Sequence, residues 1–210
     1  MEDVMRKLRS DWRGYTFKVL RRYKLRTLSL WSTAAVYMEA GLKGVRLQQG
    51  CTFYGRPVLT RVPMSCITIG SECAFRSDST SNLVGVNRRC ILATMREGAE
   101  IVIGEGSRFS GTVIAAADQI LVGKGVLCGA NVLITDFDWH PVEPHLRHDG
   151  QALSKRVIIG DNVWLGVNSI VLRGVKIGKN SVVAANSLVT HNVPANVIAG
   201  GNPCMVLKRL

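Results

Sequence analysis

The stretch DFDWHP at residues 136–141 gathers groups that can move a proton. His140 stands in it, and imidazole is the side chain that gains and loses a proton most readily near neutral pH. Two acids, Asp136 and Asp138, precede this histidine and would be placed to fix its tautomer. The chain has only four histidines, and three of them fall between residues 135 and 157. The stretch therefore indicates a candidate general base at His140.

A repeat of six residues organises the chain around this stretch. From Ile159 onward the sequence reads IGDNVW, LGVNSI, VLRGVK, IGKNSV, VAANSL and VTHNVP. The first position is always aliphatic, and the fifth is always small or β-branched. An α-helix cannot hold a period of six, whereas a solenoid of short strands can, with three hexads to each coil. The repeat predicts a β-solenoid with inward aliphatic residues and with Gly or Asn at its corners, where φ is positive.

The same period continues upstream less cleanly. It is broken at residues 76–98 and 115–120, where insertions or irregular corners are expected. Residues 135–157 lie between two blocks that keep the period, so they are predicted to form a loop extruded from the coil. Long loops on a rigid scaffold often carry binding and catalytic residues. The candidate base His140 would stand at the start of this loop.

The N-terminal segment 1–44 differs in composition from the rest. The chain carries a net charge of +12, and residues 1–46 hold 11 basic residues against 4 acidic ones. Apolar side chains such as Trp12 and Phe17 lie among the basic ones, which predicts one or two helices. Such a helix would cover the open end of the solenoid, lie against an anionic membrane surface, or do both. No nucleic-acid-binding motif is present, so no nucleic acid is expected as a partner.

Two further features bear on the compartment. The six cysteines include no CxxC pair, and Cys73 and Cys128 occupy repeat positions where small apolar residues are expected. Buried free thiols in a reducing cytoplasm are therefore favoured over disulfides. No stretch approaches the roughly 18 apolar residues of a membrane span. We expect a cytoplasmic protein that is able to contact the inner face of the membrane through residues 1–44.

The repeat, DFDWHP, the segment NVWLG and the ending GGNPCMVL together resemble the hexapeptide-repeat acyltransferases. The resemblance covers about residues 45–210 and is closest to the maltose, galactoside and surface-polysaccharide O-acetyltransferases. It implies an all-β fold: a left-handed parallel β-helix at 45–210 with an extruded loop at about 135–157, preceded by a mostly helical extension at 1–44. It also implies a homotrimer, acetyl-CoA as acyl donor, no metal, and His140 as the base that activates a sugar hydroxyl of a surface polysaccharide or its precursor.

The resemblance also assigns binding residues. Those expected near the acceptor sugar are Asp136, Asp138, Trp139, Arg147 and Ser110. Those expected near coenzyme A are Trp164, Ala185, Thr190, His191 and Lys208. Four positions depart from the family pattern: His191 replaces the usual Lys, Met205 the usual Arg, Asn186 a common Gly, and Val167 a small residue. The two lost cations would weaken binding of the nucleotide phosphates unless Arg209 or Lys179 compensates.

Three other functions remain open on the sequence alone. The same scaffold serves N-acyltransferases that modify an amino sugar or an antibiotic, and fold analogy does not separate these from O-acetyltransferases. A metalloenzyme like the trimeric carbonic anhydrases would need three convergent histidine ligands, whereas His140, His145 and His148 share one loop. A non-catalytic β-helical scaffold would bind no coenzyme A and would have no use for His140.

Overall fold

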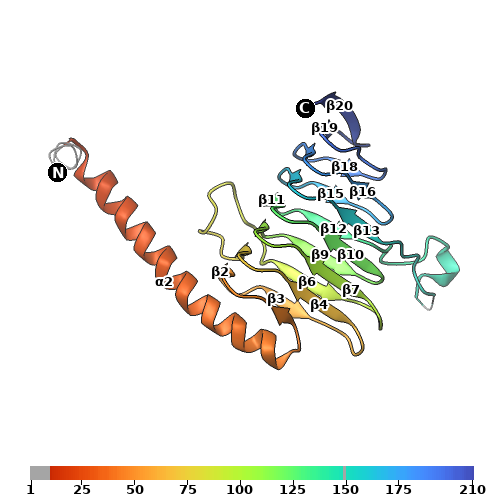
Figure 1. Cartoon of the computed structure of the whole chain (residues 1–210), viewed down its shortest axis with the longest axis horizontal. Helices are drawn as coiled ribbons and strands as arrows, with labels where there is room; N and C mark the ends of the chain where they lie inside the picture. The colour runs from red at the N-terminus through yellow and green to blue at the C-terminus, as the bar shows by residue number, and fades with distance from the viewer. Residues whose placement is uncertain (1–9, 149) are drawn as a thin grey trace.

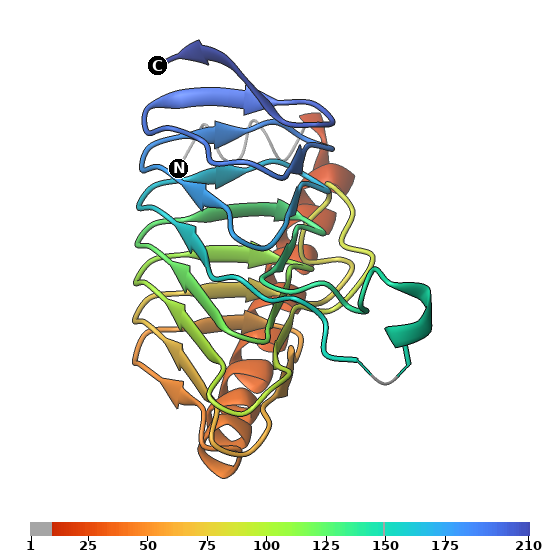
Figure 2. The ribbon, with the colours of Figure 1, turned by 90° about the vertical axis from the view of Figure 1, so that its right-hand side faces the viewer.

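A computed structural model describes residues 10–148 and 150–210, and the chain forms a three-sided solenoid with a long N-terminal helix (Figure 1). Short strands follow one another around the three sides, which we call sheets A, B and C. Each strand pairs with the strands of the neighbouring coils, as the stacked rungs of Figure 2 show. The described pairs are parallel, except that β19 and β20 run antiparallel. The predicted β-solenoid is confirmed.

The elements have the following bounds. Helix α2 is Trp12–Leu42, and a 3-10 turn, η1, is Pro144–Leu146. Sheet A contains β1 (Arg46–Leu47), β4 (Cys66–Ile69), β7 (Glu100–Ile103), β10 (Gln119–Val122), β13 (Val157–Ile159) and β16 (Lys176–Ile177). Sheet B contains β2 (Thr52–Tyr54), β5 (Ala74–Arg76), β8 (Arg108–Ser110), β11 (Leu127–Ala130), β14 (Trp164–Leu165), β17 (Val182–Val183), β19 (Val197–Gly200) and β20 (Met205–Arg209). Sheet C contains β3 (Val58–Thr60), β6 (Ile91–Thr94), β9 (Val113–Ala116), β12 (Leu133–Thr135), β15 (Ile170–Val171) and β18 (Leu188–Val189).

The period of six sets the register between coils. Trp164 pairs with Val182, and Ile170 pairs with Leu188, so each partner lies three hexads further along the chain. The first-position residues of the repeat are at most 1% exposed: Ile159, Leu165, Val171, Ile177, Val183 and Val189. Upstream, three stacked phenylalanines fill the same inner column of sheet B, with ring centroids 5.1 and 4.9 Å apart: Phe53, Phe75 and Phe109. The inward aliphatic column that the repeat predicts is confirmed.

Asparagines turn the corners between the later strands. Asn162, Asn168, Asn180 and Asn186 have positive φ values between 56° and 59°. Asparagine tolerates this left-handed backbone better than most residues that carry a side chain. Its side chain also joins the coils, because Asn162 donates to Asn180 at 3.3 Å and Asn168 donates to Asn186 at 3.2 Å. The corner residues therefore stabilise both the turn and the stacking of the rungs.

The three breaks in the period have different structures. Residues 77–90 form a long loop between β5 and β6. Residues 136–156 leave the coil between β12 and β13, at the corner from sheet C to sheet A (Figure 2). The break at 115–120 is a shortened corner of two residues, Ala117 and Asp118, between β9 and β10.

One buried carboxylate connects the last two of these breaks. Asp136 is fully buried at the start of the extruded loop. Its two oxygens accept hydrogen bonds from the backbone N–H groups of Ala117 and Asp118, at 2.7 and 2.9 Å. Burial raises the pKa of the Asp136 carboxyl above its usual value. The hydrogen bonds from the two N–H groups lower this pKa, but each by less than burial raises it. The short corner therefore supplies the donors that hold the neck of the loop in place.

Helix α2 covers the exposed edge of the first coil. Val36 and Ala40 join the hydrophobic core, and three hydroxyl groups of the helix accept hydrogen bonds from alternate N–H groups in and beside the edge strand β2 at 3.0 to 3.2 Å. Unpaired N–H groups on an edge strand would otherwise be buried without partners or open to pairing with another chain. The pairs are Ser32 with Gly55, Thr33 with Phe53, and Tyr37 with Cys51.

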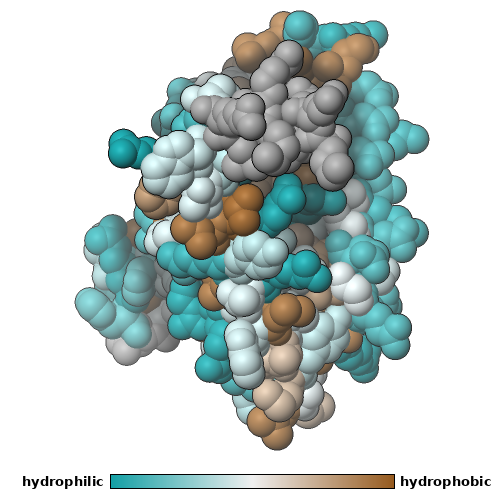
Figure 3. All heavy atoms as spheres, turned by 90° about the vertical axis from the view of Figure 1, so that its left-hand side faces the viewer, coloured by the Kyte–Doolittle hydropathy of each residue, from teal (hydrophilic) through white to brown (hydrophobic). Residues whose placement is uncertain are grey.

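The first half of α2 extends away from the solenoid (Figure 1). Its exposed side chains include Trp12, Phe17 and Tyr23, and hydrophobic and hydrophilic residues are interspersed on this side of the molecule (Figure 3). Within the described residues, no helix combines the length and the apolar character needed to cross a membrane. Three residues separate the end of the helix at Leu42 from the start of β1 at Arg46. The division into an extension (1–44, of which 1–9 lie outside the described residues) and a β-helix domain (45–210) stays a prediction.

The cysteines behave as the sequence indicates. All six are free, and all but Cys66 are buried. Burial raises the pKa of the Cys90 and Cys204 thiols, which keeps them in the uncharged form. These side chains serve as small apolar groups of the core.

The hydroxyl contacts of α2 can be tested with Thr33→Val. The substitution keeps the shape of the side chain but removes the acceptor for the N–H of Phe53. We expect a loss of about 1–3 kcal/mol in the free energy of unfolding, measured by denaturant titration. Thr27→Val is the matched control, because the Thr27 hydroxyl bonds only to carbonyls of its own helix. Equal effects of the two substitutions would contradict this role for Thr33.

The neck of the loop can be tested with Asp136→Asn. An amide offers one acceptor oxygen, so its NH₂ group would face one of the two backbone N–H donors. We expect a destabilisation of about 1–3 kcal/mol at pH 7, seen as a lower midpoint in thermal unfolding. Asp118→Asn is the control, because this neighbouring side chain is exposed. An unchanged midpoint for Asp136→Asn would show that the carboxylate does not anchor the loop.

Candidate functional site

His140 lies on the extruded loop just outside the coil. Its side chain is exposed, and the neck behind it is closed by an antiparallel bridge between Phe137 and Ser154. Two backbone hydrogen bonds reinforce this bridge: the Asp138 N–H donates to the Leu153 carbonyl at 2.9 Å, and the Lys155 N–H donates to the Asp136 carbonyl at 2.7 Å. The imidazole is therefore held on a short, fixed stem rather than on a free loop.

The tautomer of His140 is set by a backbone carbonyl. Nδ1 lies 3.2 Å from the carbonyl oxygen of Arg147. Because a carbonyl only accepts, Nδ1 carries the proton, and Nε2 keeps a lone pair. The sequence suggested Asp136 or Asp138 for this role, and that expectation is wrong for both. Asp136 is occupied by the corner N–H groups, and Asp138 accepts a hydrogen bond from Arg173 at 2.8 Å.

The aromatic part of DFDWHP forms a small surface beside the imidazole. Trp139 is 52% exposed, and its ring packs at a tilt on Phe137 with centroids 4.8 Å apart. Phe137 is buried with Ala115 and Ala117 of the neighbouring coil. The exposed indole is therefore rigidly mounted, as a platform for an apolar face of a ligand would be. The expected role of Trp139 at the acceptor stays a prediction.

The other loop residues named by the sequence are exposed. His145 lies in η1, His148 follows it, and Arg147 directs its guanidinium to the carbonyl of Val142 at 3.4 Å. Arg147 contacts His140 through its backbone, so its side chain is not needed to hold the imidazole. Its expected contact with an acceptor stays a prediction.

Ser110 lies on sheet B, away from this loop along the chain. It is the last residue of β8, is 6% exposed, and its hydroxyl accepts a hydrogen bond from the Asn82 amide at 3.1 Å. Asn82 belongs to the long loop 77–90, which covers Ser110. An acceptor would reach this hydroxyl only after the Asn82 side chain moves.

The residues expected near coenzyme A divide into two groups. Trp164 is 53% exposed on the outer face of sheet B, Ala185 is exposed at the corner between β17 and β18, and Lys208 is exposed on β20. Thr190 and His191 follow β18 at the corner from sheet C to sheet A, where Thr190 Oγ1 lies 2.8 Å from His191 Nδ1. Within the described part of one chain, the first group lies on sheet B and the second at the corner that leaves sheet C.

Thr190 and His191 lie at the same kind of corner as the loop of His140. Both the loop 136–156 and Thr190–His191 lie where the chain passes from sheet C to sheet A. Trp164 instead belongs to sheet B, on another side of the solenoid. One copy of the chain therefore presents the candidate base on one edge and the exposed tryptophan on a different face.

Two residues that position the site were missed by the sequence reasoning. Arg173 pairs with Asp138, and Asn82 covers Ser110. Arg173 could have been found from the period, because Ile134 pairs with Val171 and the same register carries Arg173 to the start of the loop. For Asn82 the sequence holds no such signal, since it lies in an insertion that does not follow the repeat.

A metal site would need several ligand side chains that converge on one point. Among residues 10–148 and 150–210, no three His, Cys, Asp or Glu side chains are grouped so that they could hold a metal ion. The three loop histidines do not converge, since the Nδ1 of His140 contacts a carbonyl and the other two are exposed. The alternative of a carbonic anhydrase-like metal centre finds no ligand set in this part of the chain.

The chain is similar to known proteins over parts of its length. A family model described as the hexapeptide repeat of succinyl-transferase matches residues 156–191. A galactoside O-acetyltransferase of Lactococcus lactis subsp. lactis (strain IL1403) is 48% identical over 115 residues, which cover 54% of this chain and 55% of that protein. The chain spans little more than half the length of several curated relatives that it matches.

Two further relatives are matched over larger parts or in three dimensions. A hexapeptide-repeat-containing acetyltransferase of Vibrio cholerae O1 biovar eltor, solved in complex with acetyl coenzyme A, is 33% identical with a TM-score of 0.50, covering 52% of this chain and 60% of that one. A protein of Escherichia coli (strain K12), provisionally named a lipopolysaccharide biosynthesis O-acetyl transferase, is 32% identical over 167 residues, which cover 72% of this chain and 84% of that protein. With its left-handed β-helix and its repeat, the chain belongs to the hexapeptide-repeat family of acetyltransferases.

Proposed function

We propose that the chain transfers an acetyl group from acetyl-CoA to a hydroxyl group of a sugar, with His140 as general base. The observation that carries the proposal is the geometry of His140, whose Nδ1 faces a carbonyl while its Nε2 is free to accept a proton. The names of the relatives from Lactococcus lactis and Escherichia coli support an O-acetyl transfer. The acetyl-CoA complex of the Vibrio cholerae relative supports the donor.

The chemistry follows from the imidazole. Nε2 of His140 takes the proton of the sugar hydroxyl while the oxygen attacks the carbonyl carbon of the thioester. The tetrahedral intermediate then breaks its carbon–sulfur bond, the imidazolium returns the proton to the sulfur, and the products are a sugar acetate and a free thiol. The carbonyl of Arg147 keeps Nδ1–H in place and stabilises the charged imidazolium.

The residues of sheet B fit a coenzyme A arm. Trp164 offers an exposed aromatic surface, the corner at Ala185 exposes backbone, and Lys208 with Arg209 brings positive charge on β20. Such groups suit a pantetheine chain and the phosphates of its nucleotide. His191 and Met205 stand where the family usually has cations, so Lys208 would carry more of the phosphate contact.

We propose that the active site forms between subunits of a homotrimer. His140 and Trp164 lie on different sides of one solenoid, so one substrate would contact both only if a second copy supplies one of them. A head-to-tail contact that repeats around a threefold axis closes into a ring with three equivalent sites. Thr190 and His191 would then join His140 from one subunit, and Trp164, Ala185 and Lys208 would come from its neighbour.

The acceptor is proposed to be a sugar of a surface polysaccharide or of its precursor. The name of the Escherichia coli relative supports this class. Ser110, Trp139 and Arg147 are the proposed acceptor contacts, whereas Asp136 and Asp138 hold the loop through other partners. A cytoplasmic location, with the exposed aromatic and basic side chains of α2 against anionic lipid, would suit a precursor carried on the inner face of the membrane.

The base is tested with His140→Ala in an assay of free thiol released from acetyl-CoA with a panel of sugars, nucleotide sugars and polysaccharide fragments. We expect kcat to fall by about 10²–10⁴-fold, because the hydroxyl loses its proton acceptor. Coenzyme A binding, measured by calorimetry, should be unchanged. His145→Ala and His148→Ala are matched controls in the same loop. Full activity in His140→Ala, or equal losses in all three variants, would refute the proposed mechanism.

The shared site is tested by mixing two inactive variants, His140→Ala and Trp164→Ala. In mixed trimers, about a quarter of the interfaces would combine an intact histidine from one subunit with an intact tryptophan from its neighbour. Activity should therefore return on co-expression. In the control, His140→Ala is co-expressed with a variant that carries both His140→Ala and Trp164→Ala. No subunit then has an intact histidine, so no interface is complete. Mixed oligomers, verified by native mass spectrometry, that stay inactive would contradict a site between subunits.

A further inference from the structure

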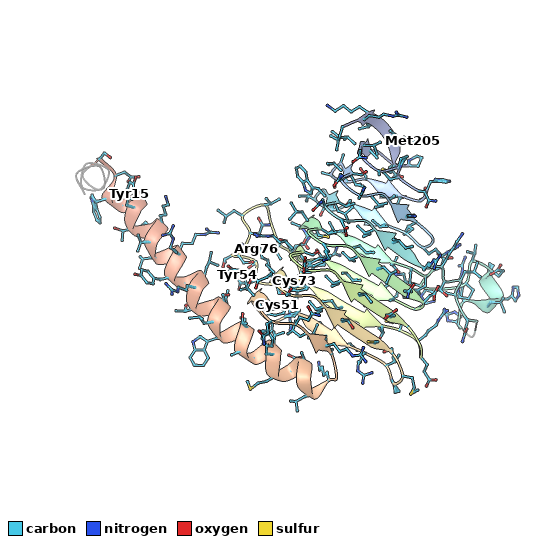
Figure 4. All side chains as sticks on the ribbon, in the orientation of Figure 1. Tyr15, Cys51, Tyr54, Cys73, Arg76 and Met205 are labelled. Carbon is cyan, nitrogen blue, oxygen red and sulfur yellow. The ribbon has the colours of Figure 1, made fainter. Side chains whose placement is uncertain are left out.

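A cleft of about 450 Å³ lies between α2 and the outer face of sheet B. Figure 4 shows Tyr54 and Arg76 on the sheet side of this cleft, facing the helix. The helix side brings four basic residues, and Ser29 adds a hydroxyl. The cationic lining residues are Lys18, Arg21, Arg22, Arg26 and Arg76.

The positive charge of this cleft is not balanced within the described chain. Among the residues that line it none is acidic, and none of the five cations forms an ion pair with a described acid. Lys18, Arg22 and Arg26 are spaced by four residues, so they stand above one another on one face of the helix. Like charges at this spacing destabilise a helix. A bound anion would remove that repulsion.

Two of the guanidinium groups are held in place before any ligand arrives. Arg76 stacks over the ring of Tyr54 at 4.3 Å and donates to the carbonyl of Ser81 at 2.6 Å. Arg21 donates to the carbonyl of Thr80 at 3.2 Å. Each hydrogen bond uses one terminal nitrogen of a guanidinium, whose five N–H donors form a rigid fork suited to phosphate oxygens. The loop 77–90 thus orients cations from both walls of the cleft.

The cleft shares a face with the proposed transferase site. Arg76 pairs with Ser110 on the next strand of sheet B. Strands β5, β8, β11 and β14 follow one another in this sheet, so Trp164 lies three strands beyond Arg76. Neighbouring strands are spaced by about 4.8 Å, which places the two side chains roughly 15 Å apart along the solenoid. A phosphate in the cleft would be within reach of a sugar presented near Ser110.

We propose that this cleft binds the phosphate or diphosphate group of a phosphate-linked sugar, and so selects the acceptor. The carrier beyond the phosphate is either a soluble nucleoside or a lipid, and both present the same diphosphate chemistry. That the bound diphosphate belongs to an acetyl acceptor rests on the proposed acetyl transfer. That the cleft binds a diphosphate does not depend on acetyl transfer, and this binding is measured separately.

Binding is tested by titrating the full chain with inorganic pyrophosphate and measuring the heat of binding by calorimetry at low ionic strength. Arg22→Gln combined with Arg26→Gln removes two cations of the cleft, and we expect the affinity to fall about tenfold. Arg13→Gln combined with Lys24→Gln is the matched control, because it removes equal charge from the same helix outside the lining. The control should stay within twofold of the unaltered chain. No pyrophosphate binding, or equal losses in both double variants, would overturn the proposal.

The acceptor role is tested by thiol release with three kinds of acceptor: a neutral sugar, a nucleoside diphosphate sugar, and a prenyl diphosphate sugar in detergent micelles. Arg22→Gln combined with Arg26→Gln should raise KM about tenfold for the diphosphate-linked acceptor that the enzyme acetylates, and leave KM for the neutral sugar unchanged. The diphosphate-linked acceptor whose KM rises identifies the carrier as a nucleoside or a lipid. An equal KM change for the neutral sugar would overturn the acceptor role.

Membrane attraction is the rival explanation of the same charges. Binding of the chain to phosphatidylglycerol vesicles without any affinity for pyrophosphate would overturn the proposed site and favour a lipid-facing surface. Failure of the proposed function would look different: no thiol release with any acceptor, while pyrophosphate still binds and Arg22→Gln combined with Arg26→Gln still weakens that binding.

Discussion

The coils of this protein depend on backbone hydrogen bonds to their neighbouring coils. A strand of two residues, such as Trp164–Leu165, is too short to be stable alone, and it persists because β11 and β17 pair with its two edges. The period of six keeps those pairs in register, since a slip by one residue would turn inward aliphatic groups outward. All parts of the candidate site are positioned by this register.

The constraint creates a problem at the first coil, which has no coil before it. The chain solves it with the hydroxyl groups of Ser32, Thr33 and Tyr37, which accept from alternate N–H groups of residues 51–55, in and beside β2. Because α2 lies along this edge, it also forms one wall of the basic cleft. The first half of the helix remains exposed. A structural solution to an open edge thus determines which charged surface stands next to the outer face of sheet B.

The repeat is interrupted at corners of the coil, and the interruptions hold His140 and several residues that position the candidate site. The loop of His140 leaves between sheets C and A, and its neck is held by the buried carboxylate of Asp136 and by the Asp138–Arg173 pair. The loop 77–90 leaves between sheets B and C, covers Ser110 and orients Arg76. Rigid coils hold the loop of His140 at one corner and Trp164 on sheet B, which is why a complete site is proposed to need two copies of the chain.

Much of the fold was readable from the sequence because the repeat is strict. The six inward residues from Ile159 to Val189, the corner asparagines and the extruded loop all follow from the period. The hydrogen-bond partners of Asp136 could not be predicted from the period. Asp136 turns to a shortened corner 18 residues earlier, and its spacing to His140 suggested a catalytic role that the hydrogen bonds do not support. The hydroxyl contacts of α2 and the basic cleft depend on how a helix crosses the solenoid, which no local pattern encodes.

The central claim is that one subunit supplies His140 and its neighbour supplies Trp164 to a single acetyl-transfer site. The most direct measurement is a crystal structure of the chain with coenzyme A bound. The account predicts a trimer in which the thiol of the coenzyme lies between His140 of one subunit and Trp164 of the next, within hydrogen-bonding reach of Nε2. A coenzyme bound within one chain, or bound away from His140, would contradict it.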